Sequence, residues 1–128
     1  MTKIRAAVCR EYNAPLTIEE VDIRAPGMGE VEVEIEAVAI CHSDISFWQG
    51  GFGCTLPAVY GHEAAGIVLS VGDGVVGIKP GDSVCVTLIH ACGHCNTCQS
   101  GKPTICETPV DNFEASPIST PDGEHVYQ

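Results

Sequence analysis

Alternating hydrophobic and polar positions predict a chain built mainly from short β-strands. Segments 3–9 and 16–23 are rich in β-branched residues, and the turn-forming sequence Asn13-Ala-Pro15 lies between them. We therefore expect the chain to open with two antiparallel strands. Further strands are expected over 67–71 and 83–89, and the second of these should be buried, with Cys85 contributing to its packing.

The clearest strand pattern covers residues 30–40. Valine, isoleucine and alanine at positions 31, 33, 35 and 37 alternate there with glutamates at 32, 34 and 36. Because successive side chains of a strand point to opposite faces, the apolar set should face the core. The glutamate row is compatible with a cation site, but polar positions that alternate in this way normally face water, which favours a solvated face.

A short helix is expected directly after this strand. Ser43 or Asp44 would cap its first turn, Phe47 and Trp48 lie in its body, and Gly50-Gly51 would end it.

Residues 72–77 read Gly-Asp-Gly-Val-Val-Gly, which satisfies the dinucleotide-binding pattern G-x-G-x-x-G. That pattern requires a helix to begin at this point, and the valines and Pro80 that follow the first glycines oppose a helix. A hairpin turn is expected instead, with a second tight turn at Pro80-Gly-Asp82. Beyond Cys106, turn residues in Pro109-Val-Asp-Asn112, at 116–117 and over 120–123 predict a loop.

Composition and charge exclude several classes of function. The chain has 128 residues, of which 45% are hydrophobic and 5% aromatic, as expected for one β-rich domain over 1–128. Its 17 acidic and 6 basic residues give a net charge of −11, which argues against a nucleic-acid or anionic-membrane partner. Without a secretory signal or an apolar run of about 20 residues, the expected protein is soluble and cytoplasmic.

Segment 92–106 contains four of the eight cysteines and predicts a structural metal site. Its spacing allows four thiolates to surround one zinc ion tetrahedrally, at Zn–S distances of about 2.3 Å. Disulfides and an iron–sulfur cluster are the alternatives; zinc is favoured because no secretory signal precedes the cluster and Glu107, not proline, follows it. His90 and His94 would bind only by displacing a thiolate, so solvated positions are favoured for them. The predicted ligands are Cys92, Cys95, Cys98 and Cys106.

A second metal site is suggested by Cys41 together with the pair His62-Glu63 inside the segment Gly61-His-Glu-Ala-Ala-Gly66. Cys41 alone is more typical of a buried thiol, and a lone histidine of a hydrogen-bonded core residue. Together they favour a catalytic zinc site at the end of a strand, where functional loops are common. The set is incomplete, because catalytic zinc uses three protein ligands and one open position.

The ordered motifs resemble zinc-dependent alcohol dehydrogenases of the medium-chain dehydrogenase/reductase superfamily, over nearly the whole chain. They are Cys41-His-Ser-Asp44, Gly61-His-Glu-Ala-Ala-Gly66, the turn at 72–77, Pro80-Gly-Asp82 and the four-cysteine segment. The resemblance implies a mainly β fold: a GroES-like, partly open β-barrel with short helices and a structural-zinc lobe. It also implies that such a domain is joined to a Rossmann domain that binds NAD(P).

The resemblance assigns roles to single residues. Cys41 and His62 would be catalytic zinc ligands, and Glu63 the nearby carboxylate that approaches the metal when ligands exchange. Ser43 would take the proton of the alcohol, while Asp44 would orient the zinc site. In the implied reaction zinc acts as a Lewis acid and hydride passes from the alcohol to the nicotinamide.

Four further positions follow from the same resemblance. His42 matches a basic residue that contacts the cofactor pyrophosphate, with a solvated loop position as the alternative. Phe47 and Trp48 would wall the substrate pocket or pack in the core. Ser46 stands where several members of the family carry a proton-relaying histidine, which leaves the relay beyond Ser43 in question.

The third catalytic ligand and the cofactor domain of the family would lie beyond Gln128. We therefore expect the N-terminal catalytic part of an NAD(P)-dependent alcohol dehydrogenase, inactive alone and weak in its second zinc site. Its substrate would be a small alcohol or aldehyde, its partner a segment bearing the Rossmann domain, and a homo-oligomer is compatible with it. The competing hypothesis is a zinc-stabilised GroES-like binding module without dehydrogenase activity.

Overall fold

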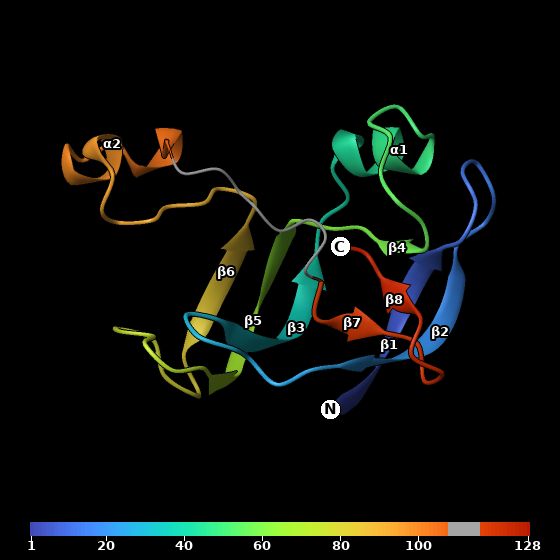
Figure 1. Cartoon of the computed structure of the whole chain (residues 1–128), viewed down its shortest axis with the longest axis horizontal. Helices are drawn as coiled ribbons and strands as arrows, with labels where there is room; N and C mark the ends of the chain where they lie inside the picture. The colour runs from blue at the N-terminus through green and yellow to red at the C-terminus, as the bar shows by residue number, and fades with distance from the viewer. Residues whose placement is uncertain (108–115) are drawn as a thin grey trace.

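The computed structural model describes residues 1–107 and 116–128, and in this part of the chain the fold is mainly β (Figure 1). The strands are β1 (Thr2–Cys9), β2 (Thr17–Ile23), β3 (Val31–Val38), β4 (Ala58–Val59), β5 (Glu63–Val71), β6 (Ser83–Thr87), β7 (Ile118–Ser119) and β8 (His125–Val126). The helices are α1 (His42–Trp48), α2 (Asn96–Gln99) and the 3-10 helix η1 (Pro103–Ile105). None of the helices described is long and apolar enough to cross a membrane.

The first sheet has the strand order β4-β1-β2-β7-β8, and its strands supply the residues of the core cluster. β1 and β2 pair antiparallel from Thr2 opposite Ile23 onward, which confirms the predicted opening pair. The turn between them includes Asn13 at a φ of 60°, a left-handed conformation that asparagine tolerates well. The core cluster of this sheet consists of Val8, Val21, Ile118 and Val126.

The second sheet has the order β3-β5-β6, and both its pairings are antiparallel. The prediction of one buried apolar face on β3 is wrong. Two register shifts interrupt the alternation of this strand, and Val31 and Ile35 of the predicted apolar set remain 37% and 50% exposed. Among the alternating glutamates of β3, Glu34 and Glu36 are exposed as expected. Glu32 is half-buried and accepts a hydrogen bond from Ser70 at 2.6 Å.

The segment after Cys106 departs from the predicted loop. Ile118–Ser119 pairs with β2 and His125–Val126 pairs with β7, so two short strands extend the first sheet. The turn over 120–123 lies between them, as its sequence indicated. Ser116 and Pro117 precede β7 without regular structure, and the predicted turn over 109–112 lies outside the described residues.

Two strand predictions need correction in the second sheet. β5 begins at Glu63, four residues before the expected start, and β6 ends at Thr87. β6 is not buried, and Cys85 is exposed, so it is not a packing residue. Residues 72–77, directly after β5, form a turn and not a helix, as predicted.

The three short helices lie outside the two sheets (Figure 1). α1 lies close to β4, whereas α2 and η1 form a separate lobe beyond the end of β6 (Figure 1). The predicted helix cap is wrong by two residues or more: Cys41, not Ser43 or Asp44, is the N-cap of α1. Asp44 nevertheless supports this end, because its Oδ2 accepts the backbone N–H of Cys41 at 2.9 Å.

Candidate metal centres

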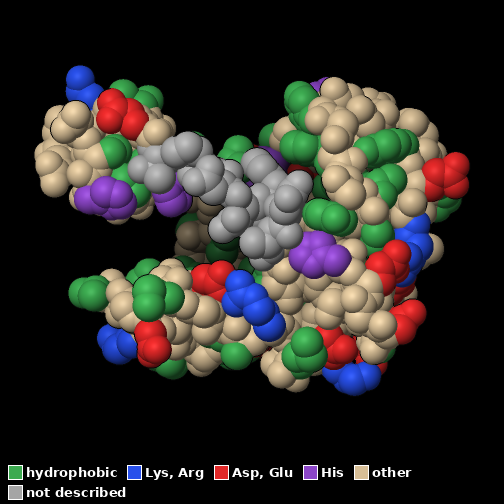
Figure 2. All heavy atoms as spheres, in the orientation of Figure 1, with side chains coloured by type: hydrophobic (Ala, Val, Ile, Leu, Met, Phe, Trp, Pro, Cys, Tyr) green, Lys and Arg blue, Asp and Glu red, His purple; other side chains and the backbone are tan. Residues whose placement is uncertain are grey.

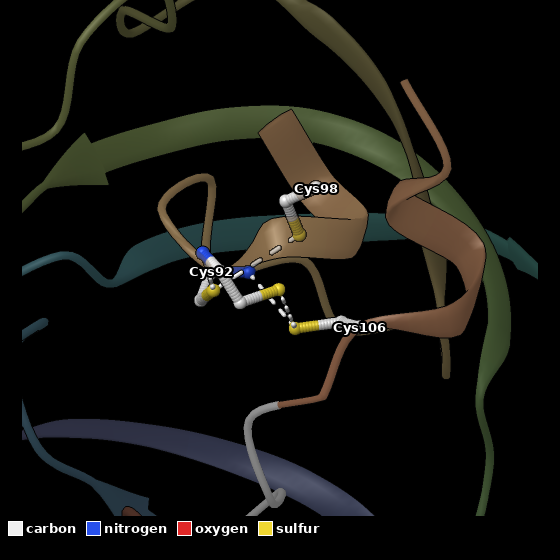
Figure 3. A group of neighbouring side chains, drawn as sticks. Cys92, Cys98 and Cys106 are labelled. Carbon is white, nitrogen blue, oxygen red and sulfur yellow. Dashed lines mark hydrogen bonds between the residues drawn. The ribbon is translucent and has the colours of Figure 1, made fainter. Parts of the chain in front are cut away.

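The four cysteines of the α2–η1 lobe converge on one point (Figure 3). Their sulfur atoms all lie within 4.8 Å of one another, with Cys92 to Cys98 at 4.0 Å and Cys95 to Cys106 at 3.9 Å. Four thiolates at about 2.3 Å from one zinc would be separated by about 3.8 Å in a regular tetrahedron. The thiols, all unbridged, therefore fit a closed tetrahedral metal site.

The backbone of the lobe donates hydrogen bonds to these sulfurs. The N–H of Cys95 donates to Sγ of Cys92 at 3.3 Å, and the N–H of Cys92 donates to Sγ of Cys106 at 3.4 Å. Such N–H groups stabilise negative charge on sulfur, as metal-bound thiolates require. His94 is exposed, with Nδ1 2.9 Å from the carbonyl oxygen of Cys92, and His90 is also exposed, as both were expected to be.

Two thiols of the lobe have strongly shifted pKa values. The Thr97 hydroxyl, 3.1 Å from Sγ of Cys95, and nearby backbone N–H groups lower the pKa of Cys95 to about 5. At Cys98 the N–H of Gly93 lowers the pKa, but burial and the neighbouring thiols outweigh it and raise the pKa to about 12. Of these two thiols, Cys95 is therefore the more readily deprotonated.

A second cluster joins residues far apart in sequence. Cys41 lies directly before α1 and His62-Glu63 at the start of β5, and their ligand atoms all fall within 4.8 Å of one another. Cys41 and His62 are half-buried, whereas Glu63 is exposed. This brings together the one thiolate, one imidazole and one carboxylate that the sequence pattern suggested, a donor set suited to zinc.

Ser43 and Asp44 border this cluster. Ser43 Oγ lies 3.4 Å from Nε2 of His62, and Asp44 Oδ1 lies 3.3 Å from Nδ1. The contact with Ser43 and the hydrogen bond to His62 lower the pKa of Cys41. The contact with Cys41, and then the Asp44 carboxylate, raise the pKa of His62. The two groups therefore shift each other's pKa in opposite directions, toward the charged form of each.

His42 begins α1, and Ser46, one helical turn later, is half-buried. His42 is exposed, and its carbonyl oxygen accepts a hydrogen bond from Ser46 Oγ at 3.2 Å. The Ser46 hydroxyl is therefore engaged with its own helix. Contact between His42 and a cofactor stays a prediction.

A cavity of about 750 Å³ opens beside the second cluster. Ser43, Asp44 and His62 line one part of it, and Phe47 lines another, as one of the two sequence alternatives proposed. Trp48 is placed differently: its indole Nε1–H donates to the carbonyl oxygen of Ala14 at 2.7 Å. The cavity also has lining residues that sequence reasoning missed, among them Phe52, Cys54, Tyr60, Leu88 and Tyr127.

Residues 27–123 match the family described as Alcohol dehydrogenase GroES-like domain. The chain belongs to this family. Alcohol dehydrogenase 1 of Pisum sativum is 43% identical over 106 residues, which are 82% of this chain and 28% of that protein. Alcohol dehydrogenase class-3 of Oryza sativa is 47% identical over 103 residues, which are 80% of this chain and 27% of that protein.

Solved structures of the alcohol dehydrogenase type share the fold. An alcohol dehydrogenase zinc-binding domain protein from Burkholderia ambifaria has a TM-score of 0.87 and 35% identity, covering 98% of this chain and 36% of that one. Benzyl alcohol dehydrogenase from Acinetobacter calcoaceticus has a TM-score of 0.78 and 28% identity, with the same coverage. The resemblance in family and fold expected from the sequence is thereby confirmed. The chain spans only 27 to 32% of the length of the curated alcohol dehydrogenases that it matches in sequence.

Proposed function

We propose that this chain is the zinc-binding catalytic domain of an NAD(P)-dependent alcohol dehydrogenase, with a structural zinc in the α2–η1 lobe and a catalytic zinc at Cys41 and His62. One observation carries the proposal. Donors from two distant segments, Cys41 and His62-Glu63, converge beside a cavity whose wall also carries the Ser43 hydroxyl.

The hydrogen bonds around His62 favour metal binding through one nitrogen. With the Asp44 carboxylate at Nδ1, the neutral ring carries its proton there, which leaves Nε2 as the nitrogen available to a metal. A carboxylate in this place also increases the basicity of the imidazole. Glu63 would offer a third donor when no other protein ligand fills that position.

Zinc at this site supplies Lewis-acid polarisation of an alcohol or carbonyl oxygen. Ser43 is placed to handle the proton, since its hydroxyl lies beside Nε2 of His62 and lines the same cavity. A hydroxyl there accepts a proton from a bound alcohol or returns one to a bound aldehyde. The Ser46 hydroxyl is held by the His42 carbonyl, so the proton would leave Ser43 by another route.

The cofactor would be bound mostly by residues outside the described part of this chain. Among the described residues, 72–77 form a turn without the helix that a dinucleotide fingerprint needs. NAD(P) would therefore be held by a Rossmann segment, with His42 contributing to its pyrophosphate. Substrates would be small alcohols and aldehydes, in line with the names of the relatives. A cytoplasmic location and a homo-oligomer fit this proposal.

The proposal is tested by zinc titration against a competing chelator, with wild type, Cys41→Ala and His62→Ala. We expect one tight and one weak class of site, and both variants should lose only the weak class. A single class in wild type would instead favour a binding module stabilised by structural zinc. Alcohol-dependent reduction of NAD(P), followed at 340 nm, should be absent for this chain alone and should appear when a Rossmann-bearing segment is added.

A further inference from the structure

Three aromatic side chains form a continuous wall in the cavity beside the second cluster. The ring centroids of Phe47 and Phe52 are 4.8 Å apart with planes tilted by 56°, and those of Phe47 and Tyr60 are 5.9 Å apart at 23°. All three residues line the cavity. We call Phe47, Phe52 and Tyr60 the ring wall.

The ring wall leaves aromatic surface open to a ligand. Phe52 is 62% exposed, although such an apolar side chain is usually covered. Figure 2 shows hydrophobic side chains gathered at the end of the molecule that carries α1. The exposed ring is not an isolated surface residue, since Phe52 also lines the cavity and its ring lies beside that of Phe47.

The polar end of Tyr60 is engaged at the back of the wall. Its hydroxyl lies 3.1 Å from Sγ of Cys54, and the hydroxyl of Tyr12 bonds to the Cys54 carbonyl. Since its polar atom already has a partner, Tyr60 contributes mainly ring surface to the cavity.

The lining of the cavity also includes polar side chains. Ser43 and His62 lie there, 3.4 Å apart at Oγ and Nε2. A ligand that satisfies both parts must carry one oxygen at the polar end and a flat apolar group at the ring wall. A ring stacked on aromatic neighbours gains affinity beyond that from the apolar area it buries, whereas a saturated ring of similar size gains only the area term.

We propose that the ring wall selects alcohols and aldehydes whose oxygen-bearing carbon is attached to an aromatic ring, the arylmethanols and arylaldehydes. The binding of the ligand oxygen beside Ser43 and His62 rests on the proposed function. The preference for an aromatic ring rests on Phe47, Phe52 and Tyr60. Phe52 is its specificity-determining residue, because it is the most accessible ring beside Phe47.

The test uses fluorine NMR titrations of the zinc-loaded chain with two probes. One probe is 4-(trifluoromethyl)benzyl alcohol, and the other is trans-4-(trifluoromethyl)cyclohexylmethanol, which has a similar size and the same hydroxyl. We expect the aromatic probe to bind about 3- to 10-fold more tightly. Phe52→Leu keeps an apolar side chain and removes the ring, so it should bring this ratio close to one.

A second variant serves as the control for the loss of apolar surface without loss of a ring. Leu88 also lines the cavity but has no ring, so Leu88→Ala should weaken both probes alike and leave the ratio unchanged. Circular dichroism checks that each variant is folded, and Phe52 and Leu88 are exposed enough for substitution to spare the core. Equal affinity of the two probes for wild type, or an unchanged ratio in Phe52→Leu, would overturn the proposal.

His62→Ala separates this proposal from the proposed function. That variant should lose the weak zinc class and still prefer the aromatic probe. Absence of the weak zinc class in wild type, with the aromatic preference intact, would support ring selection and contradict the dehydrogenase function. A wild-type weak zinc class without any aromatic preference would overturn the substrate class alone.

Discussion

The carboxylate of Asp44 lies 3.3 Å from Nδ1 of His62 through Oδ1, while its Oδ2 accepts the backbone N–H of Cys41 at 2.9 Å. One side chain thus ties together the two residues expected to bind the second metal. The side chains of Asp44 and His62 are only 13% and 20% exposed, so water competes weakly for this contact. Asp44 therefore acts as a positioning residue for the cluster.

Asp44→Asn should weaken zinc binding at the second site without unfolding the domain. The amide keeps the size of the carboxylate but removes its charge and presents an N–H group in place of one acceptor. Loss of a partner of this kind typically lowers metal affinity about 10- to 100-fold. Competition with a chelator measures the effect, and the tight site of the α2–η1 lobe serves as the internal control. An unchanged weak site in this variant would show that Asp44 does not orient His62.

Thr97→Val should weaken the structural site, because the Thr97 hydroxyl lies 3.1 Å from Sγ of Cys95. Valine has nearly the same shape and cannot donate to the sulfur. The resulting loss of zinc affinity should be about 10-fold, measured by chelator competition. Thr97→Ser retains the hydroxyl and is the matched control. If the valine and serine variants released zinc equally, shape and not the hydrogen bond would explain the position.

Both metal clusters could be predicted from the sequence because their ligands are chemically distinctive. A run of four closely spaced cysteines has few alternatives to a metal site, and the cluster found contains all four. The convergence of Cys41 with His62 depends on contacts between distant segments. Neither residue is decisive alone, but the two together favoured a zinc site, and the family resemblance then assigned both as ligands.

Other features of the fold and of the cavity could not be predicted from the sequence. β7 and β8 have two residues each, too few for any alternation to appear. Cys85 lies in an apolar run that resembles a buried strand, yet it is exposed on β6. Phe52 and Tyr60 belong to loop segments without a periodic pattern, so only the folded chain places their rings next to Phe47.

Gly66→Ala should strongly destabilise the second sheet. A Cβ atom at Gly66 would lie 2.0 Å from the carbonyl oxygen of Glu34, and this backbone atom of β3 cannot move without breaking the β3–β5 pairing. Overpacking of this kind costs about 3 kcal/mol of unfolding free energy. Urea unfolding gives the value. Gly27→Ala is the control, since its Cβ would meet only the flexible side chains of Glu30 and Arg24, at 3.3 and 3.4 Å. Similar stabilities of the two variants would contradict the role of close backbone approach at Gly66.

The ion pair between Arg10, which directly follows β1, and Glu19 on β2 should stabilise the first sheet in a pH-dependent way. The Arg10 guanidinium, which donates to Glu19 Oε1 and Oε2 at 2.8 and 2.7 Å, lowers the pKa of this carboxyl to about 2 from its ordinary value of 4.5. Because the folded-state pKa is lower, the contribution is complete above pH 4.5 and is lost as the pH falls toward 2. The pair is partly solvated, so its full contribution should be only about 0.5–1 kcal/mol.

Glu19→Gln tests this contribution through urea unfolding between pH 7 and pH 3. The variant should be less stable than wild type by that amount at pH 7. The difference should shrink steadily below pH 4.5, because Glu19 of the unfolded chain takes up a proton there while the folded carboxylate stays charged until the pH approaches 2. Glu36→Gln is the matched control, since Glu36 is an exposed strand glutamate with no ion pair among the described residues. Its stability should follow wild type at every pH. A stability difference for Glu19→Gln that stayed constant from pH 7 to pH 3 would show that its cause is not the charge of the carboxylate.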